Sequence, residues 1–254
     1  MYMKKYHTAF SGLHSDIEKN LQLGLLSLLK ESPIPDTEFI ANLPLFLRRQ
    51  DIARILFMDY LYREMIGVHG VIAEFGIRWG RNLPLLESLR GIYEPYNYNR
   101  KILGFDTFQG FPNTSEKDGK AKIIATGTLA VSDGYDAYLG RIMDHHESGN
   151  PVSHIKKYEL VKGDASISIK KYLKDHPETI FAFAYFDFDL YEPTKNVLKA
   201  IKGHLTKGSV IAFDEVNHKD FPGETLALKE VLGLDTYHLC HNPYGSAQSY
   251  LVIE

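Results

Sequence analysis

The segment from Val71 to Asp106 constrains the fold of this chain more than any other. Its first apolar run ends at Glu74, and glycines follow at Gly76 and Gly80. A helix-like stretch then leads to a second apolar run, which closes on Asp106. This is the order strand, glycine turn, helix, strand. Such a unit suits a nucleotide-like ligand, because glycines allow close backbone approach, a helix N-terminus offers free N–H groups and the final carboxylate can accept from ribose hydroxyls.

The glycine spacing differs from the G-x-G-x-x-G of dinucleotide-binding enzymes, since positions 78 and 81 are both arginine. The missing third glycine weakens the case for a dehydrogenase, which a test for NAD(H) binding would check. Taken alone, the two glycines fit equally well a tight turn between strand and helix that binds nothing. The remainder of the chain decides between these alternatives.

Strands and helices alternate through the C-terminal half of the chain. Alternation of this kind predicts an α/β fold with a parallel, doubly wound sheet. Two late strands joined by a short turn predict an antiparallel pair at one edge. We expect strands at 158–161, 181–186 and 209–213, helices at 165–173, 194–205 and 225–232, and closing strands at 236–239 and 249–253.

Two helices are expected before the first strand, one ending at Leu29 ahead of Ser32-Pro33 and the other covering about 44–66. They cover a sheet edge, form a subunit contact or line the mouth of a substrate site. The connection 108–132 has no clear periodicity, and a loop of that length is usually functional or mobile. A helical pattern resumes at 133–147.

Size and composition exclude several classes of function. The chain has 254 residues and a formal net charge of −3, which gives no electrostatic case for a nucleic-acid partner. Its one cysteine, Cys240, excludes an internal disulfide and a cysteine-rich metal site. No apolar run approaches the length of a membrane span, and the first residues lack a signal-peptide core. We therefore expect a cytoplasmic protein without a membrane partner.

Nearly every expected strand ends in an acidic residue. Ligands of open α/β sheets bind at the carboxyl ends of the strands, so these acids predict a binding site along one edge. For any single acid the alternative is a helix N-cap, which fits Asp164 best because Ala165-Ser166 open a helix. The five acids are Glu74, Asp106, Asp164, Asp187 and Asp214.

Asp187, Asp214 and Glu215 form a tighter group, because two neighbouring strands bring them to one crevice. Their mutual repulsion requires compensation. A hard divalent cation such as Mg²⁺ or Mn²⁺ suits oxygen ligands of this type. Protonation, or pairing with Arg78 or Lys219, is the alternative.

His218 follows the same group on the same loop. Imidazole titrates near neutrality, so this side chain could take a proton from a substrate hydroxyl. A surface histidine without a chemical role is an equal alternative.

Four motifs follow one another along the chain: EFGIRWG at 74–80, GFDTFQGFP at 104–112, DFDLYEPT at 187–194 and Asp214-Glu215. Together they resemble the macrocin O-methyltransferase family of class I S-adenosylmethionine-dependent enzymes. The resemblance runs from about Val71 to the C-terminus and is closest to deoxysugar O-methyltransferases of antibiotic pathways. It implies a Rossmann-like, seven-stranded sheet with the last strand antiparallel, as a methyltransferase domain at 69–254 preceded by a helical extension at 1–68.

The resemblance also implies which residues bind the cofactor, S-adenosyl-L-methionine. Asn82 would lie near its carboxylate, Asp106 would bind its ribose hydroxyls, and Asp164 would lie by its adenine. The full implied set is Glu74, Phe75, Gly76, Gly80, Asn82, Asp106, Thr107, Phe108, Asp164, Ala165 and Asp187.

The resemblance further implies that Asp187, Asp214 and Glu215 bind Mg²⁺. The cation would in turn hold two vicinal sugar oxygens, while a base takes the hydroxyl proton. The chain departs from the family at Glu215, where Asp is usual. The family also places a histidine shortly after the Gly-Phe-Asp motif, and this chain has none between Asp106 and Asp144. His218 therefore stands as a substitute, and with Asp187 it completes the candidate catalytic pair.

The sequence thus predicts a Mg²⁺-assisted sugar O-methyltransferase of natural-product or cell-surface glycan biosynthesis. Its partner would be a small sugar or glycoside, and the N-terminal helices favour a homo-oligomer. Two alternatives remain open. One is a metal-independent methyltransferase that acts on another hydroxyl or an amine, and the other is a non-catalytic nucleotide-binding protein.

Overall fold

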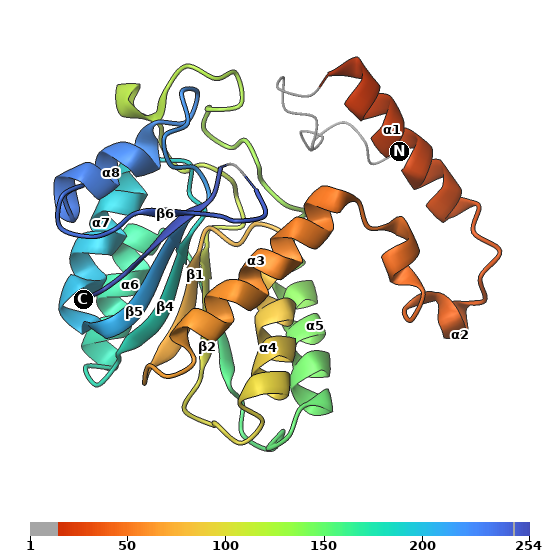
Figure 1. Cartoon of the computed structure of the whole chain (residues 1–254), viewed down its shortest axis with the longest axis horizontal. Helices are drawn as coiled ribbons and strands as arrows, with labels where there is room; N and C mark the ends of the chain where they lie inside the picture. Colours follow the sequence, from red (N-terminus) through yellow and green to blue (C-terminus); the bar gives the residue numbers. More distant parts are fainter. Residues whose placement is uncertain (1–14, 246) are drawn as a thin grey trace.

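The computed structural model describes residues 15–245 and 247–254. Within this part of the chain, seven strands form one sheet in the order β3-β2-β1-β4-β5-β7-β6 (Figure 1). The strands are β1 (Val71–Phe75), β2 (Ile102–Asp106), β3 (Tyr158–Lys162), β4 (Phe181–Phe186), β5 (Leu205–Phe213), β6 (Cys240–His241) and β7 (Ser249–Val252). β1 to β5 pair in parallel, and β7 runs antiparallel to both β5 and β6. The predicted fold class, with its antiparallel last strand, is confirmed.

Helices cover both faces of the sheet, as a parallel sheet requires. Successive residues of a strand point to opposite faces, so Ile72 packs with one group of helices and Ala73 with the other. The first group is α3 (Arg49–Met65), α4 (Asn82–Tyr93) and α5 (Tyr135–Gly149). The second is α6 (Ala165–Asp175), α7 (Tyr191–Ile201) and α8 (Gly223–Val231), with the 3-10 turn η3 (Lys202–His204) after α7. β4 lies between them and is buried at all six positions.

Most predicted elements differ from the observed ones by a few residues at their ends; the strand predicted at 209–213, for example, begins at Leu205. Three differences are larger or have a clear physical reason. The helix expected at 44–66 is a 3-10 turn, η1 (Leu43–Phe46), followed by α3, because Arg48 begins a new helix with its N–H and guanidinium bound to Asp51. α7 starts three residues earlier than expected, since Pro193 is tolerated in a first helical turn. The strand expected at 236–239 is wrong: the pairing with β7 lies at Cys240 and His241.

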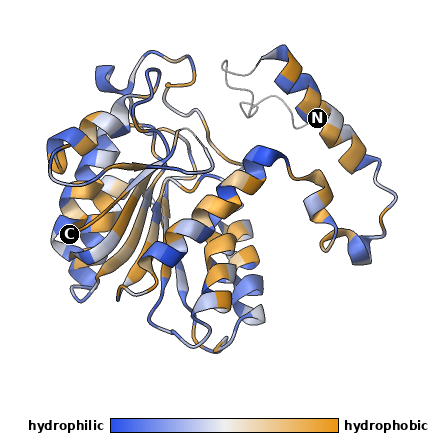
Figure 2. Cartoon of the chain, viewed as in Figure 1, coloured by the Kyte–Doolittle hydropathy of each residue, from blue (hydrophilic) through white to orange (hydrophobic). Residues whose placement is uncertain are grey.

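An N-terminal arm precedes α3 and projects from the body of the protein (Figure 1). It comprises α1 (Asp16–Lys30), α2 (Asp36–Phe39) and η1, and none of the residues in these three helices is buried. Hydrophobic residues occur along α1 (Figure 2). Three of them, Ile17, Leu21 and Leu28, have exposed side chains. Arg48 and Gln22 bring the arm to the edge of the central cleft. None of the described helices is both long and apolar enough to cross a membrane.

The long connection between β2 and α5 contains one short 3-10 turn, η2 (Glu116–Asp118). Phe111 and Thr128 hold its two ends together through a backbone hydrogen bond of 3.0 Å. The buried carboxylate of Asp118 accepts the N–H of Tyr191 at 2.6 Å, which fastens the loop to the start of α7. The connection is therefore a wall of the cleft, built from Thr107, Gly110, Phe111, Pro112, Ile123 and Leu129.

Candidate active site

A cleft of about 490 Å³ opens at the carboxyl ends of the parallel strands. Its walls come from the turn after β1, the connection after β2 and the segments that follow β4 and β5. Because parallel strands place all their carboxyl ends on one edge, residues far apart in the sequence meet here. The five predicted strand-end acids all line this cleft: Glu74, Asp106, Asp164, Asp187 and Asp214.

Gly76 follows the last residue of β1 and has a backbone conformation that side-chain-bearing residues rarely adopt. Its φ is +90°, and a Cβ at this position would lie 2.1 Å from the backbone oxygen of Asp187. The N–H of Asp187 donates to the carbonyl of Phe75 at 2.8 Å. The glycine therefore permits the direct backbone contact that places Asp187 at the rim of the cleft.

Glu74 lies buried beneath this turn. Its Oε1 accepts a hydrogen bond of 2.6 Å from Nδ2 of Asn82, whereas its Oε2 is buried without a partner among the described residues. Burial raises the pKa of Glu74 to about 7, and the Asn82 hydrogen bond opposes this shift only in part. A donor group on a ligand would satisfy the free oxygen.

Asp106 is held by the backbone on both sides of its carboxylate. The N–H of Arg78 donates to Oδ2 at 2.8 Å, and the N–H of Phe108 donates to Oδ1 at 2.6 Å. Both donors have a positive φ, 47° and 58°, which turns their N–H groups inward. Burial still raises the pKa of Asp106. Each oxygen keeps a lone pair, so a rigid carboxylate faces the cleft as an acceptor for paired hydroxyls.

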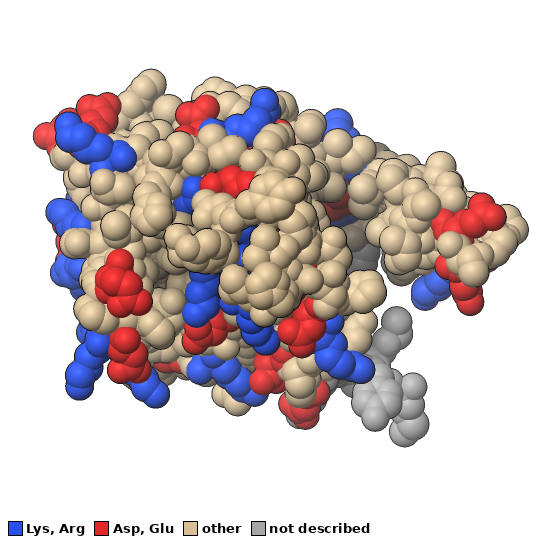
Figure 3. Space-filling view, turned by 90° about the horizontal axis from the view of Figure 1, so that it is seen from below, with Lys and Arg blue, Asp and Glu red and all other residues tan. Residues whose placement is uncertain are grey.

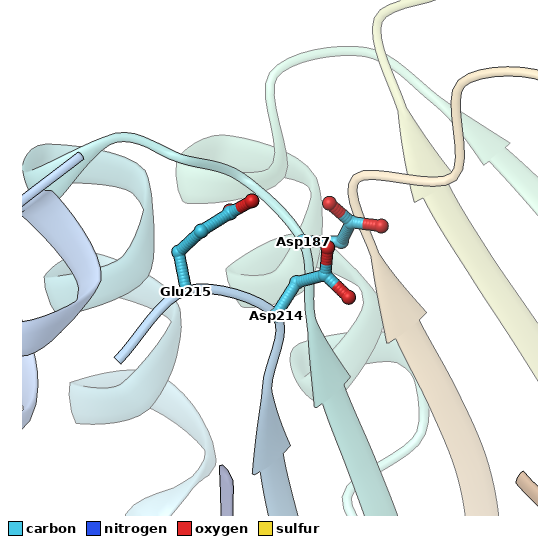
Figure 4. Close-up of side chains that lie close together, drawn as sticks. All are labelled: Asp187, Asp214 and Glu215. Atoms are coloured by element: carbon cyan, nitrogen blue, oxygen red, sulfur yellow. The ribbon is translucent and has the colours of Figure 1, made fainter. Parts of the chain in front are cut away.

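Asp187, Asp214 and Glu215 gather at the ends of β4 and β5 (Figure 4). Each offers one oxygen, and these oxygens lie within 4.8 Å of one another. Burial and then the charge of Asp214 raise the pKa of Asp187 well above its usual range, and burial raises that of Glu215. The Oε2 atom of Glu215 is buried without a hydrogen-bond partner among the described residues. Hard oxygen donors of this kind fit a divalent cation.

Arg54 of α3 is the cation that pairs with two of these carboxylates. One guanidinium nitrogen, Nη2, lies 2.8 Å from Oδ1 of Asp214 and 3.2 Å from Oδ2 of Asp187. The pairing weighed from the sequence, with Arg78 or Lys219, does not occur: within the described chain neither forms an ion pair with these acids. Nothing in the local sequence of α3 singles out Arg54, because only tertiary packing brings this helix over the strand ends.

Glu224, at the start of α8, is a second residue that sequence reasoning missed. It is fully buried, and its Oε1 accepts the N–H groups of Phe188 and Asp189 at 3.0 and 3.2 Å. Its Oε2 accepts the N–H of Glu215 at 3.2 Å. One side chain therefore ties together the segments that follow β4 and β5. The preceding Gly223 allows this approach, because a Cβ there would lie 2.6 Å from the backbone of Asp189.

Comparison with known proteins identifies the family. A crystal structure of CalS11, a calicheamicin methyltransferase, superimposes with a TM-score of 0.92 and is 47% identical, covering 94% of this chain and 93% of its own. The chain belongs to the CalS11 family of O-methyltransferases. An apo structure of CalS11, described as a TDP-rhamnose 3'-O-methyltransferase, is 44% identical over 94% of this chain and 95% of its own, with a TM-score of 0.83. The predicted resemblance to O-methyltransferases of antibiotic pathways is confirmed.

A more distant O-methyltransferase, NovP, shares the fold at 18% identity and a TM-score of 0.60, with 80% of each chain covered. Scans against protein-family models and against curated proteins gave no match. The chain is thus a class I O-methyltransferase, and its cofactor is S-adenosylmethionine.

The remaining predicted cofactor residues of this methyltransferase divide into two sets. Thr107 and Ala165 line the cleft, and Asp164 does so while also capping α6 by accepting the N–H of Ser166 at 2.8 Å. Four residues lie behind the lining. Phe75 packs in the core, Gly80 abuts Leu139, Asn82 holds Glu74, and Phe108 is buried but donates its N–H to Asp106. These four support the methyltransferase cleft through the residues they touch.

His218 lines the cleft beside Phe221, with its ring centroid 5.2 Å from that of the phenylalanine. Its Nδ1 accepts the N–H of Asp220 at 3.3 Å. An accepting Nδ1 places the proton of the neutral ring on Nε2. In this arrangement the imidazole offers the methyltransferase a donor, whereas a base needs an unprotonated nitrogen.

Proposed function

We propose that this methyltransferase transfers a methyl group from S-adenosylmethionine to a hydroxyl of a nucleotide-linked deoxysugar. The observation that carries the proposal is the 44% identity, over 94% of the chain, to a TDP-rhamnose 3'-O-methyltransferase. The acid-lined cleft supports it, since a sugar diol presents hydroxyl donors to carboxylate acceptors.

The turn after β1 and the end of β2 suit the cofactor. Glu74 offers an unpaired buried oxygen for a cationic donor, and Asp106 offers two fixed oxygens for the ribose hydroxyls. Asp164 and Ala165, one strand further along the sheet, are assigned to the adenine. S-adenosylmethionine supplies an electrophilic methyl group on a sulfonium centre. The role of these residues is to orient that group toward the carboxylate end of the cleft, where a substrate oxygen can approach in line.

We further propose that a divalent cation, Mg²⁺, binds at Asp187, Asp214 and Glu215. The unpaired Oε2 of Glu215 and the convergence of the three carboxylates support this assignment. The cation would supply Lewis acidity that eases loss of the hydroxyl proton. The Asp187 carboxylate lines the cleft, and its Oδ1 accepts no hydrogen bond from the described residues. This oxygen has two lone pairs, so one would hold the cation while the other accepts the hydroxyl proton.

The direct test is incubation of the purified protein with S-adenosylmethionine and TDP-rhamnose, with and without EDTA. A mass gain of one methylene on the sugar nucleotide, abolished by EDTA and restored by Mg²⁺, is the expected result. If the reaction proceeds fully in EDTA, the proposed cation site is wrong and the protein is a metal-independent methyltransferase. If no member of a panel of nucleotide-linked deoxysugars becomes methylated, the proposed substrate class is wrong.

We also propose that the N-terminal arm is a subunit contact. On α1, Ile17, Leu21 and Leu28 are 73%, 70% and 62% exposed, which is costly for apolar side chains facing water. In the space-filling view the arm extends to the right beyond the body, with its charged side chains mostly at the outer end (Figure 3). Light scattering should give a homo-oligomer that Leu21→Asp dissociates. A monomer at micromolar concentration would contradict the proposal.

A further inference from the structure

We infer that Arg54 is a positioning residue for the cation site, acting through the carboxylates of Asp187 and Asp214. The inference rests on the proposed cation at these residues. Arg54 comes from α3, outside the segments that carry the family motifs, and its side chain is 14% exposed. It is the one described residue that forms ion pairs with the carboxylates of the site.

The guanidinium contacts only one oxygen of each aspartate. Nη2 of Arg54 donates to Oδ1 of Asp214 at 2.8 Å and to Oδ2 of Asp187 at 3.2 Å. The hydroxyl of Tyr185, at 2.5 Å, and Nε2 of Gln248, at 3.3 Å, also donate to Oδ1 of Asp214. In the described chain the other oxygen of each aspartate accepts no hydrogen bond. Three donors thus saturate one oxygen of Asp214 and leave the second available.

Arg54 is itself fixed from several directions. Its Nε lies 3.4 Å from Oδ1 of Asn82, and its guanidinium carbon lies 5.9 Å from the centre of the Tyr185 ring. Asn82 in turn binds Glu74 at 2.6 Å. The guanidinium therefore stands at the junction of β1, β4 and β5, where it sets the separation of Asp187 and Asp214.

The contrary role is that of a competitor, in which Arg54 takes the place of the divalent cation. The two roles predict opposite effects of removing the guanidinium. A competitor would have to engage the oxygens that a cation needs, but the hydrogen bonds converge on one oxygen per aspartate. Residues that orient ligating carboxylates in this way commonly contribute about 10–100-fold to metal affinity.

The test is Mn²⁺ binding to the full-length protein, measured by electron paramagnetic resonance for wild type, Arg54→Met and Arg54→Lys. Arg54→Met should weaken Mn²⁺ binding by about 10-fold or more, while S-adenosylhomocysteine affinity by calorimetry changes less than about 3-fold. Arg54→Lys keeps the charge but loses the planar fork, so it should weaken Mn²⁺ binding several-fold. Arg63→Met on the same helix, which removes an exposed pair with Asp59, is the matched control.

Tighter or unchanged Mn²⁺ binding by Arg54→Met would overturn the inference and assign Arg54 as a competitor or bystander. Equal losses of Mn²⁺ and S-adenosylhomocysteine affinity would reduce it to a structural residue. If Arg54→Met does not fold, wild-type Mn²⁺ affinity in Arg54→Lys overturns the inference instead. If the wild-type protein binds no Mn²⁺, the proposed cation site is wrong. The inference about Arg54 is then wrong as well, because it depends on that site.

Discussion

The backbone N–H of Glu215 donates a 3.2 Å hydrogen bond to Oε2 of Glu224, a buried side chain nine residues later in the chain. The other oxygen of Glu224 accepts the N–H groups of Phe188 and Asp189. A single carboxylate on α8 therefore fixes the segment after β4 relative to the segment after β5. The geometry of the three-carboxylate group depends on this bridge, since its members lie on those two segments.

Glu224→Gln should weaken this bridge, although the glutamine side chain has nearly the same shape as that of glutamate. The amide nitrogen of glutamine would face at least one backbone N–H, and two donors cannot bond to each other. We expect a loss of about 1–3 kcal/mol in the free energy of unfolding, measured by urea titration. Glu230→Gln is the control, because it makes the same change on the same helix at a partly exposed side chain. Equal stability of the two variants would contradict the bridging role.

Gly76→Ala tests the backbone contact between β1 and β4. The added Cβ meets both a φ of +90° and the Asp187 carbonyl at 2.1 Å, so we expect a loss of several kcal/mol or failure to fold. Gly127→Ala is the matched control, because its φ is +79° but no atom lies within 4 Å of the added carbon. The difference in melting temperature between the two variants measures the destabilisation caused by the steric clash with Asp187, separately from the effect of the positive φ. Equal melting temperatures would show that the loop shifts freely.

The two candidate proton acceptors can be separated by substitution. Asp187→Asn should lower kcat by about 10²–10⁴-fold, because it removes the proposed acceptor and also weakens the proposed cation site. His218→Gln should retain more than about a tenth of wild-type kcat, since Nδ1 of His218 already accepts the Asp220 N–H and the amide of glutamine can still donate. Steady-state kinetics across pH give both values. A His218→Gln variant as impaired as Asp187→Asn, with loss of the acidic limb of the profile, would assign the base to His218.

The sequence predicted the parts of this site that local pattern encodes. Gly76 and Asp106 stand at recognisable strand ends, and alternation of strands and helices implies that such ends share one edge. Arg54 and Glu224 have no local signature: an arginine in one helix and a glutamate in another acquire a role only through packing against β4 and β5. The same limit explains the misplaced strand at 236–239, because the pairing with β7 begins only at Cys240 and depends on the position of β7 in the sheet.

A buried acid outside the cleft gives a prediction about pH. Glu87 on α4 is fully buried, and neither of its carboxylate oxygens has a hydrogen-bond partner among the described residues. Arg90 lies beside it at 3.9 Å but binds Glu147 at 3.0 Å. Burial raises the pKa of Glu87 from 4.5 to about 8, and Arg90 offsets this only in part.

The raised pKa means that Glu87 should destabilise the fold as pH rises. Between the unfolded value of 4.5 and the folded value of about 8, the unfolded chain has lost the proton while the folded chain retains it. The free energy of unfolding therefore falls by up to about 1.4 kcal/mol per pH unit across this window.

Glu87→Gln, which mimics the protonated acid, should be more stable than wild type at about pH 8 and similar to it at about pH 5, as urea unfolding at both values would show. Glu64→Gln, an exposed change on α3, should leave the pH dependence unchanged. Parallel pH curves for Glu87→Gln and wild type would mean that Glu87 is ionised in the folded protein and that Arg90 compensates its charge.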